Sequence, residues 1–496
     1  MSDFLAYLSS APCRPHSSTN VADESYDRQL RDLIAYLKQP GLVPSAAVLN
    51  ECLEAISPAV HSLSYLYLLR FRTQQLQKET AVDIPNDLQP GGSLWKHTVR
   101  FLRSFDSIQM RYAGHEWRQL VELVASAAQS VSKPVLAVKV IRDAIERLNT
   151  AGVFTSIHLL LVKLALLSSS YTSALPIVDK LLCHFPLDSG HAHTESLLCS
   201  VNEPNTVFIT DVSGFSTNLT YRDHLQFYMY SAMIYMALKN WDRASHCLSI
   251  VISAPTANSV SKIMVEAYKK WVLTNLLAHG KLSSVPNLVA PHVTRVYESL
   301  SKPYISLAEA FEKGDLQRLR AEINLGQTIW RADKNAGLVY QVYEAYDKFL
   351  VIKLGRTFSA LTMLDVLQRS SSCSKGPHDV EEFVVSLVMA DELRAALSHS
   401  PGNKTTTMLR FPLSTQSHAS REEHIRVSLM QKKAALNTIS RAIAQTENAL
   451  ETSHENIQFI AKSQKLGGNS EKTGAVGSNE ADGGGDLDED LMGDGC

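Results

Sequence analysis

Small and apolar residues recur at helical spacing along most of the chain, and short polar turns interrupt them. The segment "LKNWDRASHCLSIVI", residues 238–252, shows this pattern. Its polar turn is followed by Ala244, Leu248 and Val251, at intervals of four and three residues. Such intervals place side chains on one face of a helix, so the segment is predicted to be the second helix of a helical hairpin.

Three segments carry this hairpin pattern in the same phase. Ala244 stands where a small residue lets the two helices of a tetratricopeptide-like repeat approach each other, and Ala174 and Ala137 stand at the same place in two earlier segments. Their separations of 70 and 37 residues are about two and one times the mid-thirties period of such repeats. The matching apolar positions are Ala125, Ala128, Ile141 and Ala144 in the first unit, Val162, Ala165, Val178 and Leu181 in the second, and Ala232, Tyr235, Leu248 and Val251 in the third.

A single hairpin cannot cover its own apolar face, so neighbouring hairpins have to stack. We therefore expect an all-α-dominated fold built around a right-handed α-solenoid of tetratricopeptide-like repeats. Unrelated amphipathic helices packed in one globular domain are the alternative. Residues 25–80 are also helix-like, but their phase relative to the repeats is not defined by the sequence.

Beyond about residue 330 the pattern changes to three separate helices and two short strands. Residues 335–355 and 356–371 are predicted to form two helices, and a third begins after Pro377. The segments 393–397 and 406–411 alternate apolar and other residues on either side of a turn, which predicts a two-stranded β-wing. Three helices and a wing make a winged-helix domain.

The charges of the third helix decide which partner such a domain fits. Residues 378–392 contain five carboxylates and no lysine or arginine. A helix that reads DNA needs cations and amides toward the phosphates and bases, so no nucleic acid is expected as a partner. The alternation of Thr407, Leu409 and Phe411 instead predicts an exposed strand edge that pairs with the sheet of a neighbouring protein.

A long helix is predicted between Pro412 and Gly467, since this stretch contains no proline or glycine. Its apolar stripe follows alternating steps of four and three residues, and Lys432, Thr446 and Ser453 interrupt it. A helix of about 42 residues is roughly 63 Å long, more than the winged-helix domain can cover, so part of the stripe should enter a mixed helical bundle with other chains. The stripe consists of Ile425, Leu429, Leu436, Ile439, Ile443, Leu450, Ile457 and Ile460.

Composition supports a protein of two or three domains that is soluble and intracellular. The 496 residues are 45% apolar and 20% charged, with a net charge of −2. The start lacks the basic cluster and apolar run of a signal peptide, and Lys163 interrupts the most apolar stretch, so no membrane is expected. Seven cysteines occur without a CxxC pair. The last 30 residues hold eight carboxylates, one lysine and nine glycines, which predicts a disordered acidic tail.

No motif for catalysis, a cofactor or a small-molecule substrate is present. GxGxxG, GxxxxGK[ST], GxSxG and HExxH are all absent. Five residues could in principle surround zinc, but their spacing fits no standard finger. They are Cys183, His184, His191, His193 and Cys199. We therefore expect no metal site, no cofactor and no enzymatic activity.

A helical-repeat array followed by a winged helix and a long terminal helix resembles the layout of PCI-domain proteins. These proteins build the proteasome lid, the COP-nine signalosome and eukaryotic translation initiation factor three. Residues 227–282 are similar to the corresponding stretch in the third-subunit family of the signalosome, with a tyrosine-rich helix, the "LKNWDRA" turn and "EAYKKW". "KPYISLAEAFEKGDLQRLR" and "NAGLVYQVYEAYDKFLVIKLGRTFSAL" continue the similarity, which covers roughly residues 115–411.

The resemblance implies a non-catalytic scaffold in the complex that removes the ubiquitin-like modifier Nedd from cullins, located in the cytoplasm and nucleus. Its implied partners are other PCI-domain subunits, joined wing to wing and through a C-terminal helical bundle. A paralogous subunit of the proteasome lid and a nucleic-acid-binding winged-helix protein are the alternatives.

We expect five regions along the chain. Residues 1–110 form an N-terminal helical region and 111–330 the repeats. Residues 331–411 form the winged helix, 412–466 the bundle helix, and 467–496 the acidic tail.

Overall fold

The computed structural model divides the chain into two compact units, Met1–Gln416 and Ser417–Cys496, and each unit is described by itself. The residues whose structure is described are 8, 20–39, 44–148, 150, 152–182, 184–186, 198–199, 208–256, 260–369, 377–390, 392–399, 407–411, 418–451, 456–458, 460 and 462. The predicted acidic tail, together with Cys183, His191 and His193, lies outside these residues.

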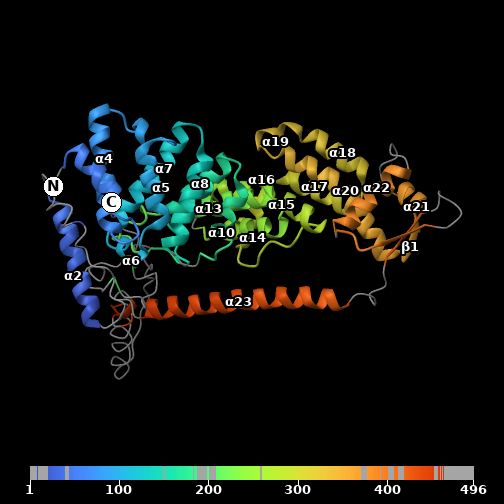
Figure 1. Ribbon diagram of the computed structural model, residues 1–496. Coiled ribbons are helices and arrows are strands. Elements are labelled where there is room, and N and C mark those ends of the chain that lie inside the picture. The colour runs from blue at the N-terminus through green and yellow to red at the C-terminus, as the bar shows by residue number, and fades with distance from the viewer. Residues whose placement is uncertain are drawn as a thin grey trace, which may run out of the picture. The chain divides into compact units, whose positions relative to one another are not determined.

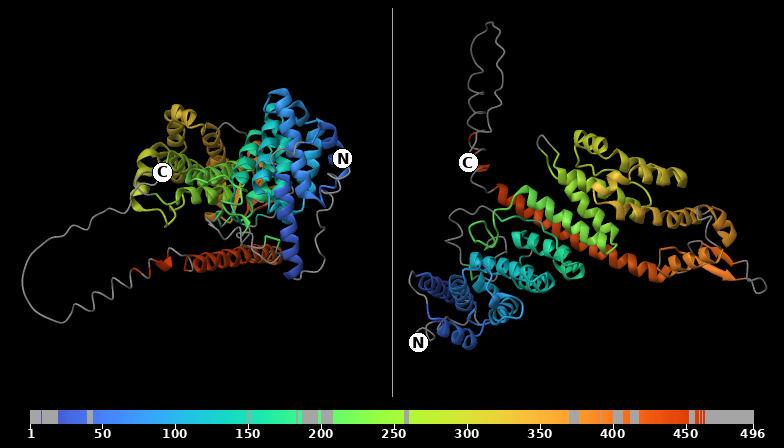
Figure 2. Two further views of the ribbon diagram at one scale, coloured as in Figure 1. Left: turned by 90° about the vertical axis from the view of Figure 1, so that its left-hand side faces the viewer. Right: turned by 90° about the horizontal axis from the view of Figure 1, so that it is seen from above.

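The first unit is a succession of helices with a small sheet at its C-terminal end (Figure 1), and the view from above in Figure 2 shows the same order. The helices before the sheet are α2 (Asn20–Leu37), α3 (Ala46–Ala55), α4 (Ser62–Thr80), the 3₁₀ helix η1 (Asn86–Leu88), α5 (Ser93–Ser104), α6 (Ser107–Met110), α7 (Gly114–Ser130), α8 (Pro134–Leu148), α9 (Ser156–Leu167), α10 (Tyr171–Val178), α13 (Tyr221–Ala237), α14 (Trp241–Ile252), α15 (Lys262–His279), α16 (Pro291–Leu300), α17 (Lys302–Lys313), α18 (Leu316–Leu325), α19 (Gln327–Ala332) and α20 (Ala336–Thr357).

The three predicted hairpins are α7 with α8, α9 with α10, and α13 with α14, and consecutive hairpins pack against one another. Ala137, Ala174 and Ala244 are all fully buried at the helix contacts, as the pattern predicts. The assignment of Leu181 to the apolar face is wrong, because α10 ends at Val178 and leaves Leu181 exposed.

Each hairpin closes through the same six-residue turn, in which one residue adopts positive φ. That residue is Ser132, Ser169 or Lys239. The amide after it donates to the carbonyl five residues earlier, as Asn240 does to Tyr235 at 2.9 Å. This is the Schellman arrangement, which satisfies carbonyl groups at a helix C-terminus and reverses the chain.

Two further hairpins with this turn were not predicted. Gly314 joins α17 to α18 and Lys334 joins α19 to α20, both with positive φ and the same pair of backbone hydrogen bonds. Five residues after the turn residue, where the first three hairpins have alanine, these two have Leu319 and Val339, and both are buried. A pattern of small residues at the helix contacts therefore does not include these two hairpins.

The apolar core of the first unit has three parts. One extends from α2 to α13 across the boundary predicted at residue 110, the second joins α13 to α20, and the third lies between α20 and the sheet. The predicted fold class, an α-solenoid followed by a winged helix, is confirmed.

A buried polar network holds α20 against the repeats. Lys269 Nζ and Tyr304 Oη both donate to Asp333 Oδ2 at 2.8 Å. Lys270 Nζ donates to Asn335 Oδ1 at 2.7 Å, and Asn335 Nδ2 donates to Tyr304 Oη at 2.9 Å. Buried polar groups are stable only when partnered, so these contacts fix the α19–α20 turn relative to α15 and α17.

The winged helix contains α20, α21 (Met363–Arg369) and α22 (Pro377–Met389), with a sheet of β1 (Ala360–Thr362), β2 (Ala396–His399) and β3 (Thr407–Arg410). The two predicted strands of the wing pair as β2 and β3, and the sheet also contains a third strand that was not predicted, in the order β1-β3-β2. The extra strand comes from the segment 356–371, which was predicted to be helical throughout. Its Leu361 is buried opposite Leu409 of β3.

The second unit is described mainly by one helix, α23 (His418–Glu451), and residues 456–458, 460 and 462 are also helical. The predicted bundle helix therefore exists over most of its expected length. No helix in the described part of the chain combines the length and apolarity needed to cross a bilayer.

His158 is fully buried in the cap of α9 and must remain neutral there. The Thr155 amide donates to its Nδ1 at 3.2 Å, so the proton lies on Nε2, which faces Thr150 Oγ1 at 3.3 Å. Protonation would place a donor against the Thr155 amide, and burial lowers the pKa of His158 to about 4.

This pKa makes the repeat array sensitive to acid. The folded-state pKa lies below the unfolded value of about 6.5, so the stabilisation is complete above pH 6.5 and is lost as the pH falls toward 4. We expect the free energy of unfolding of wild type to fall by about 3 kcal/mol more than that of His158→Gln between pH 7 and pH 4. Thermal unfolding at pH 7 and pH 4 measures it, with the exposed His279→Gln as control. Equal losses in wild type and His158→Gln would contradict the assignment.

Candidate partner-binding surfaces

The sheet of the winged helix has two outer strands, β1 and β2, and the central strand β3 pairs with both. Leu409 faces Leu361 on one side and Leu397 on the other. The Phe411 amide donates to the Ser359 carbonyl at 2.8 Å. Because backbone groups alternate sides along an antiparallel strand, odd-numbered residues of β3 bond to β1 and even-numbered residues bond to β2.

This register determines which backbone groups point away from the sheet. On β2, Ala396 and Ser398 bond to β3, so the amide and carbonyl of Leu397 face outward. On β1, the outward amide of Thr362 donates to Asp365 Oδ2 at 3.3 Å, and the same carboxylate accepts from Thr362 Oγ1. The edge of β2 is therefore the better site for an additional strand.

The predicted edge residues Thr407, Leu409 and Phe411 do not lie at an edge. They belong to or follow β3, and Leu409 is fully buried. Thr407 Oγ1 donates to Glu381 Oε1 of α22 at 3.0 Å, and Phe411 packs against the core of the winged helix. Their alternation reflects a central strand with one face on that core, so the prediction that they form the exposed edge is wrong.

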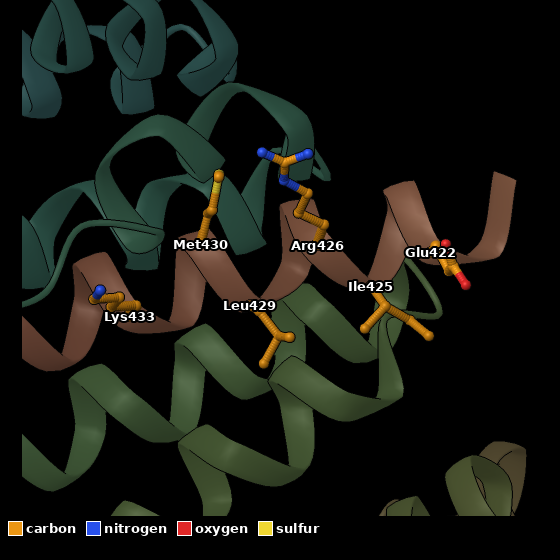
Figure 3. A pocket seen from close by; sticks show the side chains of 6 residues that line it. All are labelled: Glu422, Ile425, Arg426, Leu429, Met430 and Lys433. Atoms are coloured by element: carbon orange, nitrogen blue, oxygen red, sulfur yellow. The ribbon is translucent and has the colours of Figure 1, made fainter. Parts of the chain in front are cut away.

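The apolar stripe on α23 and the residues after it is exposed as a whole. All eight predicted isoleucines and leucines are at least 43% exposed, and Leu436 and Leu450 reach 65%. Ile425 and Leu429 line a hollow of about 310 Å³ on this helix. Figure 3 shows these two side chains projecting from one side of α23, whereas Arg426 and Met430 project from the opposite side.

No group of three or more histidine, cysteine or acidic side chains in the described residues is arranged to hold a metal ion. The polar groups around Asp333 and Asn335 form a network inside the first unit, and its members donate to and accept from one another. It positions helices and leaves the sheet edge and the stripe as the candidate surfaces.

Comparison with known proteins identifies the family. A family profile described as "COP9 signalosome complex subunit 3, N-terminal helical repeats" matches residues 27–201 and 205–293. A protein of Emericella nidulans named COP9 signalosome complex subunit 3 is 80% identical over 495 residues, which cover 100% of both chains. The chain belongs to the COP9 signalosome complex subunit 3 family. A Neurospora crassa protein of the same name is 25% identical over 425 residues, covering 84% of this chain and 83% of that protein.

Membership in the subunit 3 family confirms the resemblance inferred from short segments, and the structure shows what those segments do. "EAYKKW" carries Lys269 and Lys270, "KPYISL" carries Tyr304, and "NAGLV" begins at Asn335. These residues meet in the buried network between α15, α17 and α20. The contacts within this network span 29 to 65 residues of chain, so local periodicity does not predict them.

Proposed function

We propose that the chain is a non-catalytic scaffold subunit of the COP9 signalosome, the complex that removes the modifier Nedd from cullins. Its role is to hold neighbouring PCI-domain subunits in place while another subunit carries out the reaction. The name and full-length similarity of the Emericella relative support this assignment. They also favour it over the paralogous subunit of the proteasome lid.

The observation that carries the proposal is the exposed stripe of α23. Each of its eight isoleucine and leucine side chains gains about 1.5 to 3 kcal/mol on full burial. An exposed apolar stripe of this length is typical of a protein-binding site. The stripe has the four-and-three spacing with which helices pack into bundles, so we assign it to a bundle formed with the terminal helices of other subunits.

The second surface is the edge of β2. The outward amide and carbonyl of Leu397 can extend the sheet into that of a neighbouring winged helix, because strand addition needs only a free edge with unpaired backbone groups. The edge of β2 therefore takes the place of Thr407, Leu409 and Phe411 as the proposed wing-to-wing contact.

Nucleic acid is a poor partner for this winged helix. Within α22, Asp379, Glu381 and Glu382 are acidic, and no lysine or arginine is present. A helix of this charge repels a phosphate backbone.

We further propose that the protein works in both the cytoplasm and the nucleus, as a regulator of cullin-based ligases. Fractionation of cells followed by detection of the chain tests this location.

The wing contact is tested by removing one outward amide. Leu397→Pro eliminates the amide that faces away from β3, whereas Leu397→Ala removes the same side chain and keeps the amide. Both variants should fold, and Leu397→Pro should bind the adjacent subunit at least about tenfold more weakly than Leu397→Ala. Pull-down titration against the purified neighbouring subunits measures this difference. Equal affinities would place the wing contact elsewhere.

The bundle contact is tested by two truncations. Removal of the chain from Arg421 onward should leave the repeats and winged helix folded, since their cores lie before residue 412, but should prevent incorporation into the complex. Removal from Gly467 onward should leave incorporation unchanged. Gel filtration with the remaining subunits distinguishes them. Co-elution of the chain truncated before Arg421 with the whole complex would refute the bundle assignment.

A further inference from the structure

One cation interrupts the apolar stripe of α23. Lys432 lies between Leu429 and Leu436 in the four-and-three spacing, so it occupies a stripe position. It is exposed, and among the described residues no carboxylate forms an ion pair with it. When the stripe is buried in a bundle, the Lys432 ammonium is buried with it. It then lacks a counter-charge unless the facing helix supplies one.

The charges around Lys432 do not supply that partner. Between Glu423 and Glu447 the helix carries four basic residues and no carboxylate. They are Arg426, Lys432, Lys433 and Arg441. Carboxylates precede this basic segment at Glu422 and Glu423, and others follow it from Glu447 to Glu455, a segment without lysine or arginine. Glu423 lies about 14 Å and Glu447 about 22 Å along the helix from Lys432, and both are too far to reach it.

We propose that Lys432 selects the partner and its register, and that the facing helix of another subunit carries an aspartate or glutamate opposite Lys432. A buried ammonium without a counter-charge is strongly unfavourable. A single charged residue in an otherwise apolar seam specifies register and partner at some loss of affinity. The inference rests on the proposed bundle contact and adds the chemistry of its partner.

A second copy of this chain would fit the stripe less well than a helix with a carboxylate, if the two α23 helices ran parallel. In register, Lys432 would face Lys432, and the basic segment from Arg426 to Arg441 would face itself. An antiparallel copy would bring the segment Glu447–Glu455 toward Lys432, so self-association is an outcome that the experiment has to separate from binding to another subunit.

The test is competition for assembly between wild-type and variant full-length chains. Equal amounts of the two are mixed with the remaining subunits, the complex is isolated, and the ratio of incorporated chains is measured by mass spectrometry. Lys432→Met keeps the length of the side chain and removes the charge. Arg441 lies about 180° around the helix from Lys432, so Arg441→Glu is the matched control for Lys432→Glu.

The proposal predicts that Lys432→Met is incorporated about tenfold less than wild type, because it leaves the partner carboxylate buried and unpaired. Lys432→Glu should be disfavoured still more, and Arg441→Glu should compete within about twofold of wild type. Incorporation of Lys432→Met equal to or above that of wild type would overturn the proposal, since an apolar side chain is preferred where no carboxylate is present.

Ile439→Asp separates this inference from the proposed function. If Ile439→Asp is incorporated normally, the stripe is not the docking surface and both fail. If Ile439→Asp is excluded while Lys432→Met competes normally, only the carboxylate partner is wrong.

Carbodiimide treatment of the wild-type complex should join Lys432 Nζ to an acidic side chain of another subunit through an amide, with loss of water. A cross-link to a second copy of this chain would instead assign the stripe to self-association.

Discussion

Amphipathic helices that cannot cover their own apolar faces are the constraint on which this structure depends. A hairpin of two such helices leaves one apolar face open, and only a neighbouring hairpin can close it. The recurrent turn with one residue at positive φ reverses the chain in the same way each time. Because the same buried position follows each turn, from Ala137 to Val339, the hairpins stack into one continuous array.

The apolar face of α23 is likewise not covered by this helix alone. Its stripe has the period of a packed helix, and yet the side chains from Ile425 to Leu450 are exposed. Within the first unit, the apolar faces of the hairpins pack against one another. Asn335, in the centre of its polar network, is fully buried, and the sheet of this unit has a buried central strand. The stripe of α23 and the edge of β2 are the surfaces that we assign to neighbouring subunits.

The sequence was sufficient for the parts of the fold that depend on local periodicity. Three hairpins were predicted because alanine marked their helix contacts, whereas Leu319 and Val339 fill the same position with larger side chains that resemble any buried residue. The eight stripe residues of the terminal helix were predicted as a set, and their binding role stays a prediction. Strand order was beyond this reasoning. The alternation around Leu409 is the same for a central strand and an edge strand, and only pairing with the distant β1 distinguishes them.

Hydrogen–deuterium exchange of the whole chain, alone and in the assembled complex, tests the central claim most directly. A helix that gains a bundle partner has fewer openings, so its amides exchange more slowly. The account predicts that exchange of the α23 amides between Ile425 and Leu450 slows by roughly a hundredfold on assembly, while α14, already buried in the array, changes little. Unchanged exchange along α23 in the intact complex would contradict the claim that its apolar stripe holds the protein in place.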